Sequence, residues 1–516
     1  MSTATQPAIP AAPRQTWSAR VFSLPVVMGL GLIDLLVFYS NPGGNVDRIV
    51  ADTDIWWHLR NAAELLRTGH FPHTANWTFT VAGRPWMNGE WLAELPYYAA
   101  YRALGDFGLY LVTMLVVSAI VLGIYGLARM RSGSWKGAFA GGMLTVVFAT
   151  VSLAPRTLLF GWLSLVAELA VLWNLEKGRD YTAWLPLVFL FWVNAHGSWF
   201  IGFVLMLVYF AGGWFQGEWG DIYARRWTPA QKRKLLAVTA ASFAALFVNP
   251  YGWRLVAYPL NVAYGQNLMI QSAAEWASLD FHDPRGKIVL AVFAILAILQ
   301  LVRRHRWSVQ DLAFALIAVY GAVTYVRFVF LTGILLAPML AIEVSPGPKS
   351  ASDPASAPAS APASAPLSVP DRGRQWVNAL VLALLLAYLL FRAPTPRQLR
   401  AGVAAEFPEK AIPTVRSLAG QGNLFSDVNW AGYLEWNAPH VNEFADTRLD
   451  VFVHQGIMSD YLQATRLQNT FAILDKYRIR YTLLPKDTPM AYLLAHSPAW
   501  KATYDDNQAV IFERVH

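Results

Sequence analysis

Long apolar runs recur along most of this chain and are separated by shorter polar segments. Most of these runs have about 17–22 residues, which is the helix length needed to cross a hydrocarbon layer of about 30 Å. Helices satisfy their own backbone hydrogen bonds inside a membrane, so the pattern predicts an α-helical polytopic membrane protein. About eleven transmembrane helices are expected, near residues 21–40, 107–128, 137–153, 157–175, 183–196, 199–216, 235–250, 287–302, 309–325, 328–344 and 376–392.

Other segments interrupt or follow this pattern. Residues 41–106 form a polar loop after the first run, and residues 251–286 form a second long loop. Residues 345–375 contain the repeat SASDPASAPASAPASAPLSVP, whose composition predicts a linker without a packed core. Residues 393–516 alternate short β-like runs with helical stretches, which predicts a small α/β domain. Its last run, at 508–515, is expected to close a hairpin.

The composition agrees with a membrane protein, because 55% of the 516 residues are hydrophobic and only 14% are charged. A soluble chain of this length would divide into several domains with far more surface charge. The absence of cysteine excludes disulfides, thiolate metal sites and cysteine nucleophiles. The net charge of +8 does not indicate a nucleic-acid partner, since the basic residues concentrate in loops expected on one side of the membrane.

The positions of these basic residues predict the orientation of the chain. Lysine and arginine precede the first run and follow every even-numbered run, and such residues favour the cytoplasmic side. Residues 1–20 and the linker at 345–375 are therefore expected in the cytoplasm. The loops at 41–106 and 251–286 and the domain at 393–516 are expected outside it.

Two aspartates open the first external loop, in the sequence DTDIWWHLR. In an extended segment Asp52 and Asp54 can point the same way. One carboxylate could then accept a proton, and the other could help to hold a divalent cation such as Mg²⁺ or Mn²⁺. The alternative is that Asp54 only caps the helix that follows it. Apolar residues at helical spacing, with Trp56 and Trp57 among them, predict that this helix lies in the membrane interface.

In these features the chain resembles the GT-C glycosyltransferases, multi-spanning enzymes that take a sugar from a polyprenyl-phosphate carrier. The resemblance begins with the acidic pair after the first span, in DTDIWWHLRNAAELLRTGHFP. It continues through WVNAHGSWFIG, LFVNPYGW and EWASLDF, and then through NLFSDVNWAGYLEW and FADTRLD in the C-terminal part. The chain lacks the WWDYG motif of oligosaccharyltransferases, which argues against transfer to asparagine.

The resemblance implies a hexosyl- or pentosyltransferase of a bacterial inner membrane, with lipids around it and an external active site. Asp52 would be the catalytic carboxylate that deprotonates or orients an acceptor glycan, lipid or protein. Arg327, Arg156 and His196 would bind the donor phosphate, since a leaving phosphate needs cationic or hydrogen-bonding partners. As alternatives, the arginines could reach to lipid headgroups and the histidine could be structural.

Further candidates lie in the other two external segments. Glu275 could supply a second acidic residue, although a solvated loop carboxylate is the alternative. The residues Trp430, Tyr433, Asp446 and Arg448 could bind the acceptor, because aromatic and charged groups suit carbohydrate recognition. Core packing together with a structural Asp446–Arg448 pair is the alternative, and it is favoured over carbohydrate binding.

Two other functions stay open on the sequence alone. A transporter or flippase for a lipid-linked or polar substrate would place ionisable groups near the middle of the membrane. Asp34 and Glu168 fall inside predicted spans, and sugar transfer gives Asp34 no role, but no repeat relates the two halves of the chain. A non-enzymatic assembly component would keep the outer domain and tolerate the loss of Asp52.

Overall fold

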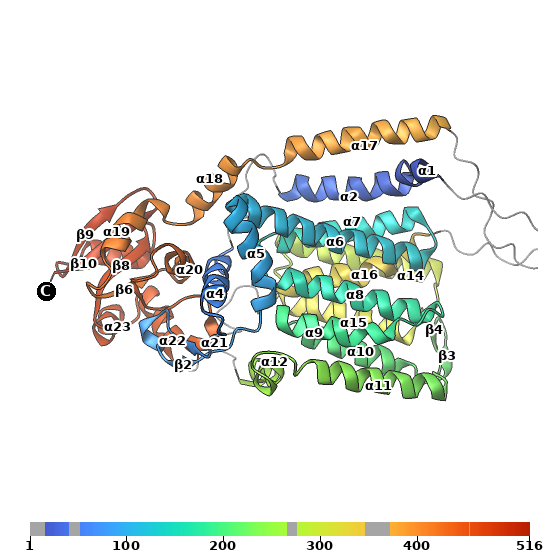
Figure 1. Cartoon of the computed structure of the whole chain (residues 1–516), viewed down its shortest axis with the longest axis horizontal. Coiled ribbons are helices and arrows are strands. Elements are labelled where there is room, and N and C mark those ends of the chain that lie inside the picture. Colours follow the sequence, from blue (N-terminus) through green and yellow to red (C-terminus); the bar gives the residue numbers. More distant parts are fainter. Residues whose placement is uncertain (1–15, 41–51, 266–275, 346–371, 454, 516) are drawn as a thin grey trace, which may run out of the picture.

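Long helices run side by side and form a bundle, and a domain built around a β-sheet covers one end of that bundle (Figure 1). Helices α4 (Ile55–Thr68) and α5 (Trp91–Leu104) lie between the bundle and this domain. The structure is a computed structural model that describes residues 16–40, 52–265, 276–345, 372–453 and 455–515.

A helix overlaps every range in which a transmembrane span is expected. These helices are α2 (Leu24–Ser40), α6 (Asp106–Ser132), α7 (Trp135–Ala149), α8 (Leu158–Glu176), α9 (Leu185–Ala195), α10 (Trp199–Gly212), α11 (Pro229–Ala245), α14 (Pro284–Arg303), α15 (Val309–Thr324), α16 (Val329–Glu343) and α17 (Arg372–Arg392). Short helical segments adjoin them at α1 (Trp17–Val21), η3 (Thr150–Ser152), η4 (Thr182–Trp184) and η6 (Val326–Phe328).

Within the described residues, five helices are long and apolar enough to cross a membrane. They are α6, α8, α14, α17 and the continuous η6–α16 segment. The apolar helices α2, α9, α10 and α15 are shorter. Helix α9 has only 11 residues, whereas a perpendicular span needs about 20. The helical membrane architecture is therefore supported, and the number of eleven spans stays a prediction.

Helix α16 lies at the centre of the bundle and is buried along almost its whole length. It packs closely against α7 because glycines on α7 face it. A Cβ atom at Gly141 would lie 2.6 Å from the Ala337 carbonyl oxygen, and one at Gly137 would lie 2.4 Å from that of Ala341. Small residues at such positions let two helix backbones approach, which is how membrane helices gain packing contacts.

The described part of the first loop, residues 52–105, folds into a layer against the C-terminal domain. It contains α4, the short pair β1 (Thr74–Ala75) and β2 (Arg84–Pro85), the turn η2 (Phe79–Val81), and α5. Trp56 of α4 is fully buried, and its ring centroid lies 4.9 Å from that of Tyr433 in the C-terminal domain. The apolar face of α4 is therefore covered by protein, and its position in the membrane interface stays a prediction.

Residues 393–516 contain a five-stranded sheet in the order β7-β6-β8-β10-β9. Strands β7 and β8 run parallel to β6, whereas β10 runs antiparallel to both β8 and β9. The closing hairpin expected from the sequence is confirmed as β9 and β10, with Val510 opposite Asp505. The strands are β6 (Asn423–Ser426), β7 (Asn442–Glu443), β8 (Ile479–Pro485), β9 (Trp500–Asp505) and β10 (Ala509–Arg514).

Helices precede the first strand of this domain and connect most of the later ones. Some of these helices lie between the sheet and the first loop. The helices of the domain are α18 (Pro396–Glu406), η7 (Glu409–Ala411), α19 (Ile412–Ser417), α20 (Val428–Asn437), α21 (Leu449–Val453), α22 (Ile457–Thr465), α23 (Thr470–Lys476) and α24 (Pro489–Ala495). Helix α20 packs on α4, and helix α12 (Trp253–Gly265) lies at the same end of the bundle (Figure 1).

The opposite end of the bundle carries a small sheet of β3 (Gly217–Trp219), β4 (Ile222–Ala224) and β5 (Trp307–Ser308). Beside it, the guanidinium of Arg131 donates two hydrogen bonds to the carboxylate of Asp311, at 2.6 and 2.8 Å. This buried pair ties α6 to α15. The two ends of the bundle therefore differ, because one carries this small sheet and the other is covered by the first loop and the C-terminal domain.

Candidate active site

A cavity of about 240 Å³ lies where the bundle, the first loop and the C-terminal domain meet. Its walls come from the start of α4, the segment before α5, the N-terminus of α8, the turn after α9, α12, η6 and α21. The ionisable residues that line it are Asp52, Asp54, His58, Glu90, Arg156, His196, Tyr258, Arg327, Arg448 and Asp450.

Asp52 is a buried carboxylate, and both of its oxygens accept hydrogen bonds. Its Oδ2 accepts from Nε of Arg156 at 2.5 Å, and its Oδ1 accepts from the backbone N–H of Asp54 at 3.0 Å. The Asp52 side chain is 1% exposed, whereas that of Arg156 is 39% exposed. The ion pair therefore presents its cationic member, and not its carboxylate, to the open space.

Asp54 occupies the N-cap position of α4, but its side chain makes no capping hydrogen bond. The Nε1–H of Trp57 donates to its Oδ1 at 3.3 Å instead. The interpretation that Asp54 only caps the helix is therefore wrong. The two aspartates do line one cavity, as the sequence pattern predicted.

A third carboxylate, Glu90, lies immediately before α5 and was not anticipated from the sequence. The hydroxyl of Thr157 donates to its Oε2 at 2.6 Å. Nε2 of His58 lies 3.6 Å from Oε2, and Nε2 of His196 lies 3.4 Å from Oε1. Partial burial raises the pKa of Glu90 to about 7, and Asp54 raises it further while the Thr157 hydrogen bond opposes the shift.

A fully buried network supports Glu90 from behind. Oε1 of Glu94 lies 2.7 Å from Nδ1 of His58, and its Oε2 accepts from Asn61 at 2.6 Å and from Asn88 at 2.9 Å. Burial raises the pKa of Glu94 well above its ordinary value. Burial also lowers the pKa of His58, so this imidazole is neutral near pH 7. The network fixes the ring of His58 against Glu90 without adding a cation.

His196 follows α9 in an extended conformation and also faces Glu90. Its Nδ1 accepts the backbone N–H of Ser198 at 2.9 Å. A neutral ring therefore carries its proton on Nε2, the nitrogen that lies 3.4 Å from Glu90. The observed partner of His196 is thus a carboxylate, and its expected contact with a phosphate stays a prediction.

The second arginine expected from the sequence also reaches the cavity. Arg327 belongs to the η6 turn, and its guanidinium carbon lies 4.3 Å from the ring centroid of Trp276. Stacking on an indole face orients a guanidinium, so this contact holds Arg327 at the wall of the cavity. Glu275, the expected second acidic residue, lies outside the described residues.

An apolar groove of about 460 Å³ adjoins the cavity. It runs between the ends of α2 and α7, the start of α14 and the start of α16, and it contains Ile288, Val289 and Val329. Asp52 and Arg156 border both the groove and the cavity. The ion pair therefore lies at the junction of an apolar space and a polar one.

Two of the expected acceptor-binding residues lie in the protein interior. Trp430 is 6% exposed and Tyr433 is 1% exposed, and neither lines the cavity. The ring of Tyr433 stacks on Phe407 at a centroid distance of 5.0 Å and also contacts Trp56. These side chains offer no face to a sugar, so core packing is the correct explanation for them.

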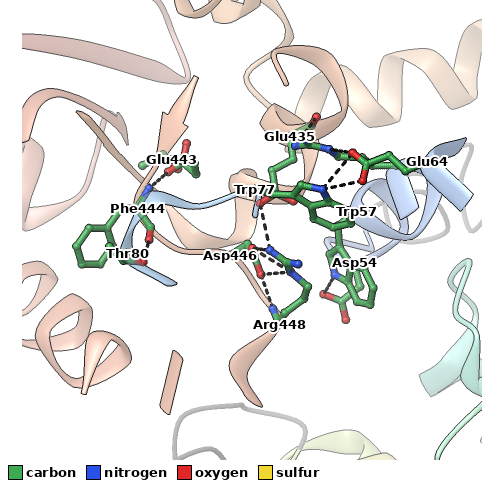
Figure 2. Close-up of polar contacts among 12 residues, drawn as sticks. Asp54, Trp57, Glu64, Trp77, Thr80, Glu435, Glu443, Phe444, Asp446 and Arg448 are labelled. Carbon is green, nitrogen blue, oxygen red and sulfur yellow. Dashed lines mark hydrogen bonds and ion pairs between the residues drawn. The ribbon is translucent and has the colours of Figure 1, made fainter. Parts of the chain in front are cut away.

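Asp446 and Arg448 form the structural pair that was the alternative explanation (Figure 2). Nη2 of Arg448 donates to Oδ2 of Asp446 at 2.5 Å. The guanidinium carbon lies 4.3 and 4.6 Å from the ring centroids of Trp77 and Trp86 in the first loop. Arg448 borders the cavity, but its main contacts hold the C-terminal domain on the first loop.

Asp450, two residues after Arg448, supplies the cavity with a carboxylate from the C-terminal domain. Tyr258 of α12 donates a hydrogen bond to it. Burial raises the pKa of Asp450 to about 6, against the opposing effects of Arg448 and of this hydrogen bond. Membrane bundle, first loop and C-terminal domain thus all contribute ionisable side chains to one space.

The possible divalent cation at Asp52 and Asp54 stays a prediction. Among the described residues, no group of three or more His, Cys, Asp or Glu side chains is arranged to hold a metal ion. Asp52 directs its two oxygens to Arg156 and to the backbone of Asp54. A cation bound between the aspartates would compete with the guanidinium of Arg156 for the carboxylate of Asp52.

No family model matches the chain, and no curated protein matches its sequence significantly. The oligosaccharyltransferase AglB from Archaeoglobus fulgidus, in complex with an inhibitory peptide and a dolichol-phosphate, superposes at a TM-score of 0.53. That alignment has 11% identity and covers 91% of this chain and 70% of AglB. The A. fulgidus oligosaccharyltransferase tethered to an acceptor peptide superposes at a TM-score of 0.51, with 12% identity, over 96% and 75% of the two chains. This chain has the GT-C fold.

The GT-C fold agrees with the expectation drawn from the sequence motifs. ArnT from Cupriavidus metallidurans, bound to undecaprenyl phosphate, aligns over 95% of this chain and 98% of ArnT with 12% identity. Its TM-score of 0.48 is too low to support a fold assignment. Identities this low establish a common GT-C architecture alone, so the activity must be inferred from the cavity.

Proposed function

We propose that this chain is an integral-membrane glycosyltransferase that moves a sugar from a polyprenyl-phosphate donor to an extracytoplasmic acceptor. The observation that carries the proposal is the position of the Asp52–Arg156 pair between the apolar groove and the polar cavity. A lipid-linked sugar needs an apolar channel for its prenyl chain, a cation for its phosphate and polar space for its sugar. The dolichol-phosphate bound by AglB supports the same class of donor.

In the proposed reaction, the acceptor oxygen forms a bond to C1 of the sugar while the bond from C1 to the phosphate oxygen breaks. The electron pair of that bond stays with the phosphate, which leaves as polyprenyl phosphate. The proton of the acceptor hydroxyl passes to a carboxylate of the cavity. Arg156 and Arg327 stabilise the negative charge that develops on the leaving phosphate. Asp52 is essential because it orients Arg156.

The acceptor, a glycan, lipid or protein, reaches the cavity from the side of the C-terminal domain. Asp450 and Tyr258 stand on that wall, and their carboxylate and hydroxyl suit the hydroxyl groups of a polar acceptor. The distribution of basic residues supports a bacterial inner membrane with the N-terminus in the cytoplasm. The cavity then faces the periplasm, where lipid-linked sugars are used.

Lipid mass spectrometry on the purified protein tests this proposal. The wild-type chain is expected to bind undecaprenyl phosphate, and Arg156→Leu is expected to weaken that binding at least ~10-fold because it removes a charge-assisted contact. Arg102→Leu, which changes an exposed arginine of α5, is the matched control. Equal binding by both variants, or no binding by the wild type, contradicts the proposal.

A further inference from the structure

Glu90 differs from the other carboxylates of the cavity in what surrounds it. Its side chain is 27% exposed, and its contacts are a threonine hydroxyl and the Nε2 atoms of His58 and His196. None of these partners carries a fixed charge. The Thr157 hydroxyl donates its hydrogen bond to a lone pair of the Glu90 carboxylate. Glu90 is therefore held in place by uncharged contacts, while the charge of Arg327 across the cavity lowers its pKa.

Asp52, by contrast, is poorly placed to take a proton from a substrate. Its side chain is 1% exposed, and both oxygens already accept hydrogen bonds from Arg156 and from the backbone. A proton acceptor must come within hydrogen-bonding distance of the group that loses the proton. Of the two carboxylates, only Glu90 has side-chain surface open to the cavity.

We infer that Glu90 is the general base for sugar transfer and that Asp52 is a positioning residue for the donor phosphate. This inference rests on the proposed function. The acceptor hydroxyl gives its proton to the Glu90 carboxylate as its oxygen bonds to C1 of the sugar. The C1–O bond to the phosphate breaks, its electron pair leaves with polyprenyl phosphate, and Glu90 afterwards releases the proton to water.

The surroundings of Glu90 tune it for this role. A general base works best when its pKa is close to the working pH, and the pKa of Glu90 is about 7. The titratable or charged groups that face it are His58 of α4, Asp54 before α4, Glu94 of α5, His196 after α9, Tyr258 of α12, Arg327 of η6 and Asp450 of α21.

Substitution of Thr157 distinguishes a general base from a purely structural residue at Glu90, because only a general base would shift the pH dependence of activity. Its hydrogen bond favours the ionised carboxylate and so lowers the pKa of Glu90. Thr157→Val keeps the shape of the side chain and removes the donor, so the pKa of Glu90 should rise. Because the base must be ionised, activity should rise with pH through about 7 in the wild type and through a higher pH in Thr157→Val.

The experiment uses the full chain in lipid nanodiscs with a panel of undecaprenyl-phosphate hexoses and pentoses. Water serves as the acceptor, and the released undecaprenyl phosphate is measured across pH 5–10. Glu90→Gln is expected to lower release ~100-fold or more and to leave the binding of undecaprenyl phosphate unchanged. Glu64→Gln, a change to a first-loop carboxylate outside the cavity, is expected to behave as the wild type.

Each outcome bears on a different claim. Release by Glu90→Gln at the wild-type rate, or a pH profile that Thr157→Val leaves in place, overturns the assignment of Glu90 while sugar transfer stands. Loss of undecaprenyl phosphate binding in Glu90→Gln also overturns it, since it would make Glu90 a donor-binding residue. If the wild type neither binds undecaprenyl phosphate nor releases it from any donor, the proposed function fails and this inference fails with it.

Discussion

At the scale of single residues, the environment of each carboxylate decides what it can do. Asp52 lies against a guanidinium and is closed to solvent, whereas the direct contacts of Glu90, at the edge of the cavity, are a hydroxyl and two imidazoles. Two acids of similar intrinsic strength are thereby given different roles, one electrostatic and one in proton transfer. The neutral imidazoles of His58 and His196 help to keep Glu90 oriented.

Asp52→Asn should reduce sugar transfer by ~100-fold or more, because Arg156 loses the charge that orients it toward the phosphate. The variant should still fold and insert, since asparagine fills nearly the same volume. Release of undecaprenyl phosphate from a sugar donor is the measurement. Asp180→Asn, which breaks an exposed ion pair with Lys234, is the control. Unchanged release in Asp52→Asn would contradict the role given to Asp52.

The sequence predicted part of this site, and the reasons are specific to each residue. Asp52, Arg156, Arg327 and His196 stand out because polar groups at the ends of apolar helices are conspicuous, and all four line one cavity. Glu90, in NGEW, resembles any solvated loop carboxylate. Its importance comes from contacts with residues of α4, α8 and α9, and no local pattern reports such contacts.

At the scale of elements, the first external loop and the C-terminal domain act as one layer. The guanidinium of Arg448 contacts the rings of Trp77 and Trp86 of the loop. The hydroxyl of Thr80 donates to the Phe444 carbonyl at 2.5 Å (Figure 2). Helix α4 belongs to the same layer, because α20 of the C-terminal domain covers its apolar face. An apolar helical face looks the same whether lipid or another domain covers it.

Arg448→Met should destabilise the protein by about 3–5 kcal/mol, because it leaves the buried Asp446 carboxylate without its cation. The double variant Asp446→Asn with Arg448→Met removes both charges and should be less destabilised than Arg448→Met alone. Unfolding in denaturant, followed by tryptophan fluorescence, measures the difference. A single variant that loses less than about 1 kcal/mol, the usual value of an exposed pair, would show that the contact is not a buried clamp.

At the scale of the whole molecule, an apolar groove of the bundle joins a cavity that the C-terminal domain covers. The hydrophobic pattern predicted the helices of the bundle and the final hairpin, since both depend on local periodicity. It did not predict that several helices are too short for a full span, or that α21 reaches back to the cavity. Those features depend on packing between segments that are distant in sequence.

Removal of divalent cations should leave sugar transfer intact. Arg156 and Arg327 supply the positive charge that a leaving phosphate needs, and the oxygens of Asp52 are already engaged. Release of undecaprenyl phosphate is therefore expected to be the same with and without excess EDTA. An activity that EDTA abolishes and Mn²⁺ or Mg²⁺ restores would show that a cation takes part after all.

A structure of the protein with bound undecaprenyl phosphate, determined by electron cryomicroscopy, tests the central claim most directly. The account predicts phosphate density within hydrogen-bonding distance of Arg156, with Arg327 facing the same space and the prenyl chain in the groove beside Val289 and Val329. Phosphate density at the opposite end of the bundle, or a prenyl chain that avoids this groove, would contradict it.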